Sequence, residues 1–210
     1  MTDAPELLEQ AIAWTQAEMP SGAGHDWNHI ERVLKNASAL AAEEPGADLL
    51  VVRLAAVMHD LVNLPKDHPK RRMASTMSAE RAADWLADKL APERVALVCE
   101  AIRCHSFSAG FLPQSLEARI VSDADKLDSL GAIGIARTFE CGGQMGRLTL
   151  SADDPFCAER SPDDGVYTVD HFYTKLLGLL TLFHTESGRR QAERRLAFMR
   201  LYLDTLASEL

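Results

Sequence analysis

Histidine and aspartate are the residue types in this sequence that could hold a metal ion. His59 and Asp60 are adjacent and follow the apolar run at residues 54–58. An isolated His-Asp dipeptide is common by chance, but His29 and Asp125 lie in two other segments with helical character. A helical bundle can bring three distant helices together, so that two imidazoles and two carboxylates face one ion. We therefore expect a metal site.

This donor set predicts the kind of ion. Mixed nitrogen and oxygen ligands suit Mn²⁺, Fe²⁺, Co²⁺, Ni²⁺ or Zn²⁺ and leave positions open for water. We expect Mn²⁺ first, with Mg²⁺ and the other four as alternatives. Such an ion lowers the pKa of its water from about 15.7 towards 7 and polarises a phosphoryl oxygen. One ion is expected; if a second binds, Asp60 would bridge the two, with His68 and His105 as further ligands.

Positive charge follows the His-Asp pair within a few residues. Lysine offers phosphate a point charge, and arginine offers a fork of parallel N–H groups. The alternative is a solvated basic face, which is what most runs of charge are. His105 could also contact phosphate or be an ordinary loop histidine. The residues expected to contact substrate phosphate are Lys66, His68, Arg71, Arg72 and His105.

The order of His29, His59-Asp60 and Asp125 resembles the H…HD…D signature of the HD superfamily of metal-dependent phosphohydrolases. The resemblance covers nearly the whole chain. The sequence is similar to a compact bacterial branch of the superfamily, in which some members are nucleotide pyrophosphohydrolases. It implies that these four residues are the metal ligands. The extended segments that carry it are residues 25–33 (HDWNHIERV), 65–69 (PKDHP), 123–137 (DADKLDSLGAIGIAR), 172–177 (FYTKLL) and 185–189 (TESGR).

The resemblance further implies hydrolysis of a phosphoanhydride or phosphoester bond in a small nucleotide. We expect a nucleoside triphosphate to be cleaved to monophosphate and pyrophosphate, with Asp60, Lys66, His68 and Asp128 as catalytic residues. The alternatives are a phosphomonoesterase or phosphodiesterase on the same metal site, or a non-catalytic module that binds metal or nucleotide.

One position departs from a longer pattern that this sequence resembles. Some HD enzymes have a glutamate three residues after the HD aspartate, which serves as general base. Asn63 is at that position here and cannot take up a proton. Asp128 and Asp26 are candidates for a replacement base, and Asp26 is equally suited to cap a helix.

Helical patterns dominate the elements that must position these residues. Leu8, Ile12, Thr15 and Met19 predict one face of a first helix, and a second helix runs through His29, Val33 and Leu40. A third begins at a capping Asp48 and carries Val51, Leu54, Met58 and Leu61. Further helices are expected at about 74–90, 93–103 and 188–206, and residues 116–141 are expected to be mostly helical with Gly131 and Gly134 inside the stretch. The fold class is all-α, an HD-domain-like helical bundle, with residues 1–210 as a single domain.

A long segment separates the last two of these helices. Residues 142–166 contain Gly142, Gly143, Gly146, Pro155 and Pro162, and a connection of that length is either a lid over the site or a plain surface excursion.

Composition limits the partners. Acidic residues outnumber basic ones, 31 to 22, which argues against non-specific binding to nucleic acid polymers or anionic membranes. No run approaches a membrane span, and the N-terminus does not resemble a signal peptide. The four cysteines form no CxxC pair. We expect a cytoplasmic protein with reduced thiols, a small-molecule nucleotide as partner, and a monomer or homodimer.

Overall fold

The computed structural model describes residues 3–19, 27–64, 68–106 and 109–210. It forms two compact units, residues 1–125 and 126–210. In the described residues the regular structure is helical, and the sole β-pairing there is an isolated bridge between Leu148 and Tyr167. The all-α expectation is confirmed. A single domain over the whole chain stays a prediction.

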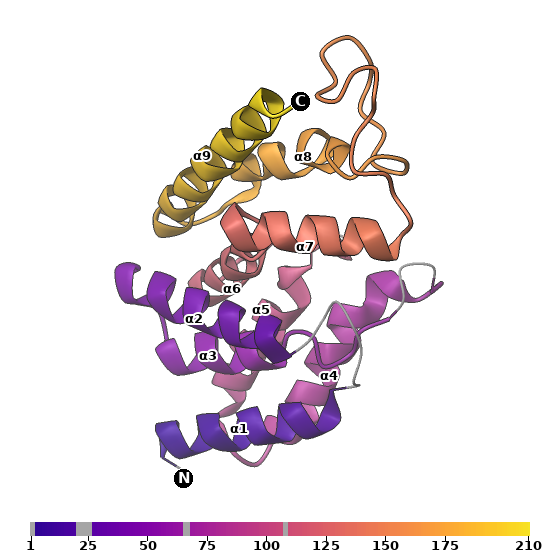
Figure 1. The fold of residues 1–210 in the computed structure, drawn as a ribbon. Helices are drawn as coiled ribbons and strands as arrows, with labels where there is room; N and C mark the ends of the chain where they lie inside the picture. The colour runs from indigo at the N-terminus through magenta and orange to yellow at the C-terminus, as the bar shows by residue number, and fades with distance from the viewer. Residues whose placement is uncertain (1–2, 20–26, 65–67, 107–108) are drawn as a thin grey trace. The chain divides into compact units, whose positions relative to one another are not determined.

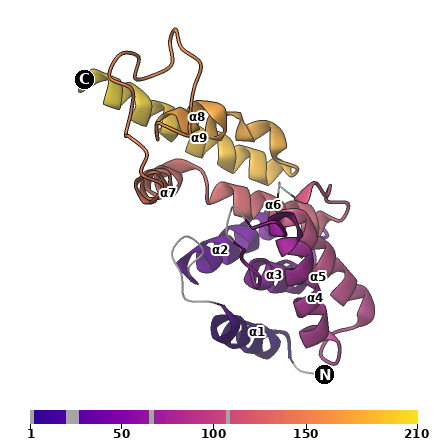
Figure 2. The ribbon, with the colours of Figure 1, turned by 90° about the vertical axis from the view of Figure 1, so that its right-hand side faces the viewer.

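The first unit is built around α3. This helix packs against α1, α2 and α5, and α4 packs against α5 (Figures 1 and 2). Contact on several sides explains why seven of the ten residues of α3 are buried rather than a single stripe. The helices of this unit are α1 (Ala4–Glu18), α2 (Trp27–Glu43), α3 (Leu49–Met58), η1 (Arg71–Met73), α4 (Ala74–Leu86), α5 (Pro92–His105) and α6 (Leu116–Leu127) up to Asp125.

The buried face of α1 is shifted from the expected one, and the two faces share Thr15. Leu7, Ala11 and Thr15 are buried, whereas Leu8 and Ile12 are only half-buried. The two rows of side chains are neighbours on the helix surface, and hydrophobicity alone favours the row with the larger residues. The small side chain of Ala11 suits close helix packing, which a count of apolar residues does not capture.

Asp48 joins the N-terminal ends of three helices. Its side chain caps α3 by accepting hydrogen bonds from the backbone N–H groups of Leu50 and Val51. The same carboxylate accepts two hydrogen bonds from the Arg94 guanidinium, at 2.6 and 2.7 Å. The backbone N–H of Asp48 donates to Glu117 Oε1 at 2.8 Å. Because Arg94 and Glu117 lie in the first turns of α5 and α6, this Asp48 network ties those helices to the start of α3.

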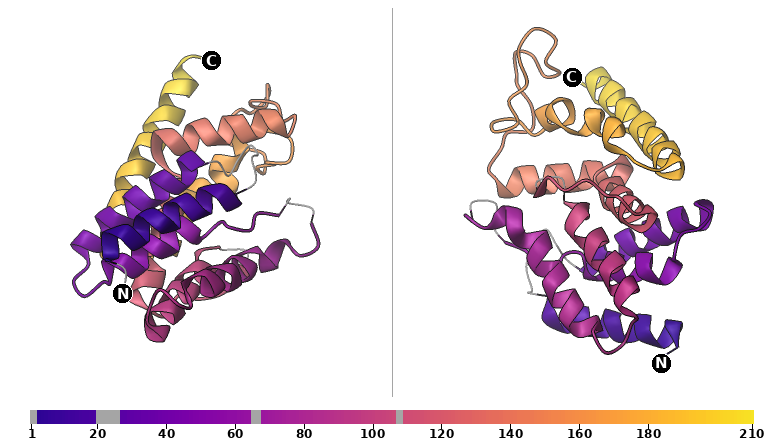
Figure 3. Two further views of the ribbon diagram at one scale, coloured as in Figure 1. Left: turned by 90° about the horizontal axis from the view of Figure 1, so that it is seen from below. Right: turned by 180° about the vertical axis from the view of Figure 1, so that it is seen from behind.

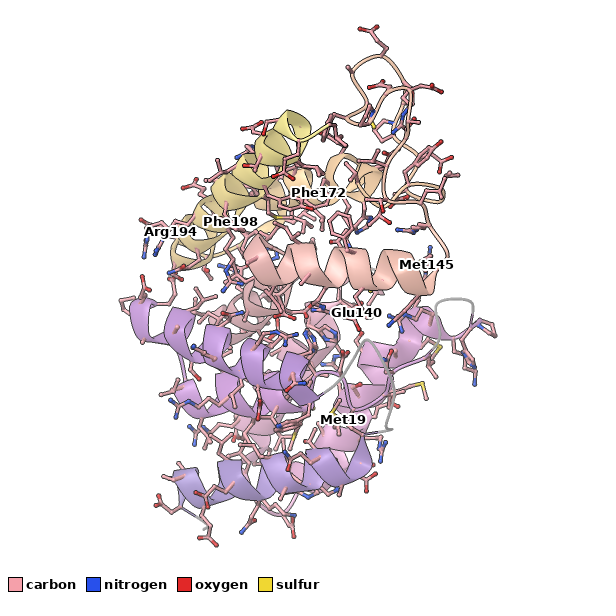
Figure 4. All side chains as sticks on the ribbon, in the orientation of Figure 1. Met19, Glu140, Met145, Phe172, Arg194 and Phe198 are labelled. Atoms are coloured by element: carbon pink, nitrogen blue, oxygen red, sulfur yellow. The ribbon has the colours of Figure 1, made fainter. Side chains whose placement is uncertain are left out.

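The second unit packs α7 against α9 (Figure 3). Its core includes the buried Phe172, labelled in Figure 4, whose ring stacks on Tyr202 of α9 with centroids 6.1 Å apart. The irregular segment before α8 is fastened to that helix because Arg160 donates to Asp170 and Asp164 accepts from His171. Whether this segment acts as a lid stays a prediction. The helices are α7 (Gly131–Gln144), α8 (Asp170–Thr174), η3 (Leu176–Leu182) and α9 (Glu186–Ser208).

The stretch expected to be mostly helical, residues 116–141, forms two helices. α6 ends at Leu127 and α7 begins at Gly131, whose φ of +72° lies in the left-handed region that favours glycine. A further helical residue at that point would have a negative φ, so the helix is interrupted there.

Two other expectations concern the whole chain. Within the described residues, no helix combines the length and apolarity that a membrane span needs. All four cysteines, Cys99, Cys104, Cys141 and Cys157, are free thiols.

The Asp48 network predicts a stability effect. In Asp48→Ala, α3 loses its cap and Arg94 loses its partner, so the free energy of unfolding should fall by about 2 kcal/mol, roughly half from the cap and half from a partly exposed ion pair. Urea denaturation of the wild type and the variant measures this. Asp88→Ala, which removes an exposed carboxylate beside Lys89, is the matched control and should change stability by less than about 0.5 kcal/mol. Equal midpoints for all three proteins would contradict the role given to Asp48.

Candidate metal centre

Ends of helices carry the metal-competent side chains of the first unit. His59 directly follows α3 and Asp60 comes next, His105 is the last residue of α5, and Asp125 lies in the last turn of α6. His29 lies in the first turn of α2. The Asp48 network holds α3, α5 and α6 together at their other ends. The amide of Asn36 on α2 donates to the carbonyl of Ala124, next to Asp125, at 3.4 Å.

The donor atoms of these residues converge. His29 Nε2 lies 3.2 Å from His59 Nε2 and 3.4 Å from Asp125 Oδ1. Asp60 Oδ2 lies 3.7 Å from His59 Nε2 and 3.9 Å from His29 Nε2. On the other side of the same carboxylate, Asp60 Oδ1 lies 3.5 Å from His105 Nε2. These five residues, His29, His59, Asp60, His105 and Asp125, are called the donor cluster below.

Backbone carbonyl groups set the orientation of two imidazoles. His59 Nδ1 lies 2.8 Å from the Ala56 carbonyl oxygen, and His105 Nδ1 lies 2.7 Å from that of Ile102. A carbonyl oxygen can only accept, so each Nδ1 must carry a proton and donate it. In the neutral ring the lone pair is therefore on Nε2, which faces the donor cluster. A metal-binding histidine is commonly oriented in this way.

Burial and charge act on the protonation of these side chains. His59 is fully buried, and the loss of water lowers its pKa to about 4, so its ring is neutral near pH 7. Burial alone would also lower the pKa of His105, but the hydrogen bond and charge of Asp60 raise it above the ordinary value. Burial would raise the pKa of Asp125, yet the contact with His29 holds it well below its usual range. The cluster thus presents a neutral imidazole and an ionised carboxylate, as a cation requires.

The donor spacing fits a divalent ion. With bonds of about 2.1 Å, neighbouring ligands are roughly 3.0 Å apart in an octahedron and 3.4 Å apart in a tetrahedron. The distances of 3.2 to 3.9 Å around His29 and His59 are close to this range. Two groups of donors could each hold an ion: His29, His59 and Asp125, and His59, Asp60 and His105. Asp60 faces the first group with Oδ2 and His105 with Oδ1.

Helix ends add to the field at the cluster. α3, α5 and α6 each place their last turn there. The C-terminal end of a helix carries a partial negative charge, equivalent to about half an elementary charge. Three such ends favour a cation beyond what the two carboxylates contribute.

The other residues expected at the site are placed differently. His68 accepts a hydrogen bond from the Lys70 backbone N–H through Nδ1, at 3.1 Å. Arg71 donates to Asn63 and to the Leu64 carbonyl, and Arg72 is exposed. Asp128 is buried in the second unit and paired with Arg137, which suits a structural role; its part as a base stays a prediction. Lys66, His25 and Asp26 lie outside the described residues.

One contact was not expected from the sequence. Asn63 is at the position where some HD enzymes have a glutamate. In the structure its side chain accepts a hydrogen bond from Arg71 Nη1 at 2.7 Å. Arg71 is eight positions after Asn63, and the sequence between them has no helical periodicity, so no pattern in the sequence links the two residues.

Comparison with known proteins identifies the family. The model of the HD domain family matches residues 26–130, which include the whole donor cluster. The chain is 30% identical to the Bacillus subtilis protein YpgQ over 203 residues, 96% of this chain and 93% of that protein. The crystal structure of YpgQ in complex with ADP superimposes with a TM-score of 0.76 at 30% identity, covering 99% of this chain and 96% of that one.

A second solved structure supports the same relationship. It is an HD-superfamily hydrolase from Bacillus thuringiensis, with a TM-score of 0.77, 31% identity, and coverage of 99% of this chain and 98% of that one. The chain therefore belongs to the HD domain family and is a metal-dependent phosphohydrolase of that superfamily.

Proposed function

We propose that this enzyme is a Mn²⁺-dependent pyrophosphohydrolase that cleaves a nucleoside triphosphate to the monophosphate and pyrophosphate. The donor cluster carries the proposal, because its imidazoles and carboxylates can hold an ion beside which a phosphate chain can be attacked. In such a site a divalent ion supplies an activated water molecule and polarises a phosphoryl oxygen.

Four side chains are proposed as the ligands. His29, His59, Asp60 and Asp125 would hold the ion, with the Ala56 carbonyl keeping the His59 ring in the tautomer that exposes Nε2. His105 is proposed as a contact for substrate phosphate, since its Nε2 faces Asp60 Oδ1 at the edge of the cluster. Mn²⁺ accepts mixed imidazole and carboxylate donors in six-coordinate sites, which leaves room for water and substrate.

A nucleotide as substrate rests on two observations. The related protein YpgQ has been crystallised with ADP, at 30% identity over nearly the full length. In this chain, residues 66–72 after the His-Asp pair carry Lys66, His68, Lys70, Arg71 and Arg72, against one acidic residue, Asp67. Cations at that position complement a phosphate chain whose reacting end lies at the metal. Lys66 is proposed to belong to the same phosphate-binding group.

The reaction product tests the proposal directly. Purified protein with Mn²⁺ should release pyrophosphate from at least one nucleoside triphosphate, followed by phosphorus NMR over a panel of nucleotides. Release of orthophosphate alone would replace the proposal by a phosphomonoesterase or a stepwise phosphatase. Turnover of a cyclic or bridged nucleotide would indicate a phosphodiesterase, and binding without turnover a non-catalytic module.

Removal of single ligands should separate the metal site from the fold. His59→Ala and Asp60→Ala should lower Mn²⁺ affinity by at least about a hundredfold and abolish activity, because each deletes a direct donor. Metal content is measured by mass spectrometry after dialysis, and circular dichroism verifies the helices. His171→Ala, a histidine paired with Asp164 in the second unit, is the matched control and should keep its metal. Full activity in Asp60→Ala would rule out this site.

Lys66→Ala should weaken substrate binding without affecting metal binding. The variant is expected to keep its metal, because lysine is not a ligand at neutral pH, but to lose a point charge for phosphate. KM for the triphosphate should rise by about tenfold, as expected for the loss of a charged hydrogen bond. Steady-state kinetics with metal content verified would measure this, and an unchanged KM would remove Lys66 from the proposed phosphate group.

A further inference from the structure

Asn63 and Arg71 form a contact just after the metal-binding dipeptide. Arg71 Nη1 donates to Asn63 Oδ1 at 2.7 Å and also to the carbonyl oxygen of Leu64. Asn63 follows Asp60 by three residues, and Arg71 is the first residue of η1. The contact therefore fastens the start of η1 to the chain that leaves the donor cluster.

The geometry of the guanidinium leaves its other edge available. Both contacts use Nη1, which is on the edge away from the fork formed by the Nε and Nη2 N–H groups. Within the described part of the chain, that fork has no protein acceptor, and the Arg71 side chain is half-buried. A fork of two parallel N–H groups matches two oxygens of a phosphate.

The backbone on both sides of the contact is held in place. On one side, the N–H of Val62 donates to the Ser78 hydroxyl of α4 at 2.9 Å. On the other, the N–H of Arg71 donates to the His68 carbonyl at 2.9 Å, and α4 begins directly after η1. The guanidinium is thus anchored at its backbone and at one nitrogen, which restricts where the open fork can point.

The chemistry of residue 63 matters as much as its position. A carboxylate there would hold Arg71 in the same way but would cancel most of its positive charge. The amide oxygen of asparagine accepts the hydrogen bond without carrying a charge. The two carboxylates of the donor cluster repel a polyanionic substrate. A guanidinium whose charge residue 63 does not cancel would offset part of that repulsion.

We propose that Asn63 is a positioning residue that aims the Nε and Nη2 fork of Arg71 at the phosphate chain of the substrate. The asparagine then serves the phosphate-binding group in place of supplying a base. This inference rests on the proposed function, since it names how one part of that site recognises pyrophosphate. It predicts that Asn63 affects anion binding only through Arg71.

A double-mutant cycle tests this dependence. Inorganic pyrophosphate is titrated calorimetrically into the Mn²⁺-loaded wild type, Asn63→Ala, Arg71→Ala and the double variant, with equal Mn²⁺ in cell and syringe. Each single variant should bind about tenfold more weakly, and the double variant no more weakly than Arg71→Ala. Losses that multiply in the double variant, or no pyrophosphate binding by the wild type, would overturn the inference.

Asn63→Asp separates positioning from simple structural support. The acid keeps the acceptor, so the melting temperature should not fall, but its charge should weaken pyrophosphate binding severalfold and should not raise kcat. Wild-type affinity in this variant would contradict the proposal. Arg53→Ala and Ser38→Ala, which break a similar half-buried arginine contact between α3 and α2, are the matched controls and should bind pyrophosphate normally.

The binding assay is independent of turnover. If nucleoside triphosphates yield orthophosphate, the proposed reaction fails while the cycle still reports on Arg71. If pyrophosphate is released but the cycle is additive, the reaction stands and the role of Asn63 fails.

Discussion

The ionic hydrogen bonds between Arg94 and Asp48 constrain the helices that carry the donor cluster. They fasten the first turn of α5 to the cap of α3, while Glu117 fastens α6 to the backbone of the same residue. The three helices begin close together, and their C-terminal ends also meet, at the donor cluster. Those ends carry His59, His105 and Asp125, so an interaction distant from the chemistry contributes to the arrangement in which the donors meet.

The donor cluster would be costly without a cation. Packing two imidazoles, whose Nε2 atoms share a hydrogen bond at 3.2 Å, beside two carboxylates removes these polar groups from water. A bound ion converts the same proximity into favourable coordination. The cluster also differs from a closed structural site, because Asp60 and Asp125 remain partly exposed, at 13% and 27% of the side-chain surface. Solvent and substrate can therefore reach the carboxylate side, whereas the His59 side is sealed by the core.

The sequence predicted the parts of the structure that depend on residue type and local period. The all-α class and the helices that carry His29 and His59 follow from apolar spacing and from a cap at Asp48. The convergence of His29, His59, Asp60 and Asp125 was accessible because few residue types bind metals.

Contacts across irregular backbone were not predictable. The sequence predicts Asp48 as a helix cap, but no spacing in it indicates that Arg94 and Glu117 form hydrogen bonds with Asp48. The sequence identifies Arg71 as a cation, but its hydrogen bond to Asn63 spans a stretch of sequence without helical periodicity. The shift in the buried face of α1 and the break between α6 and α7 were not predictable for a related reason. Hydrophobicity does not indicate how closely helices approach, and the sequence does not give the sign of φ at Gly131.

The shared anchoring of α3 and α5 restricts how this sequence can change in length. His59 is eleven positions after Asp48, and His105 is eleven positions after Arg94. Each helical residue turns the chain by about 100° and advances it by about 1.5 Å. One inserted or deleted residue in either stretch would rotate His59 or His105 away from the donor cluster, while the Asp48 network stayed fixed. Natural length variation in relatives should therefore be absent from these two stretches and concentrated in the irregular segment before α8, where the backbone has no helical phase to preserve.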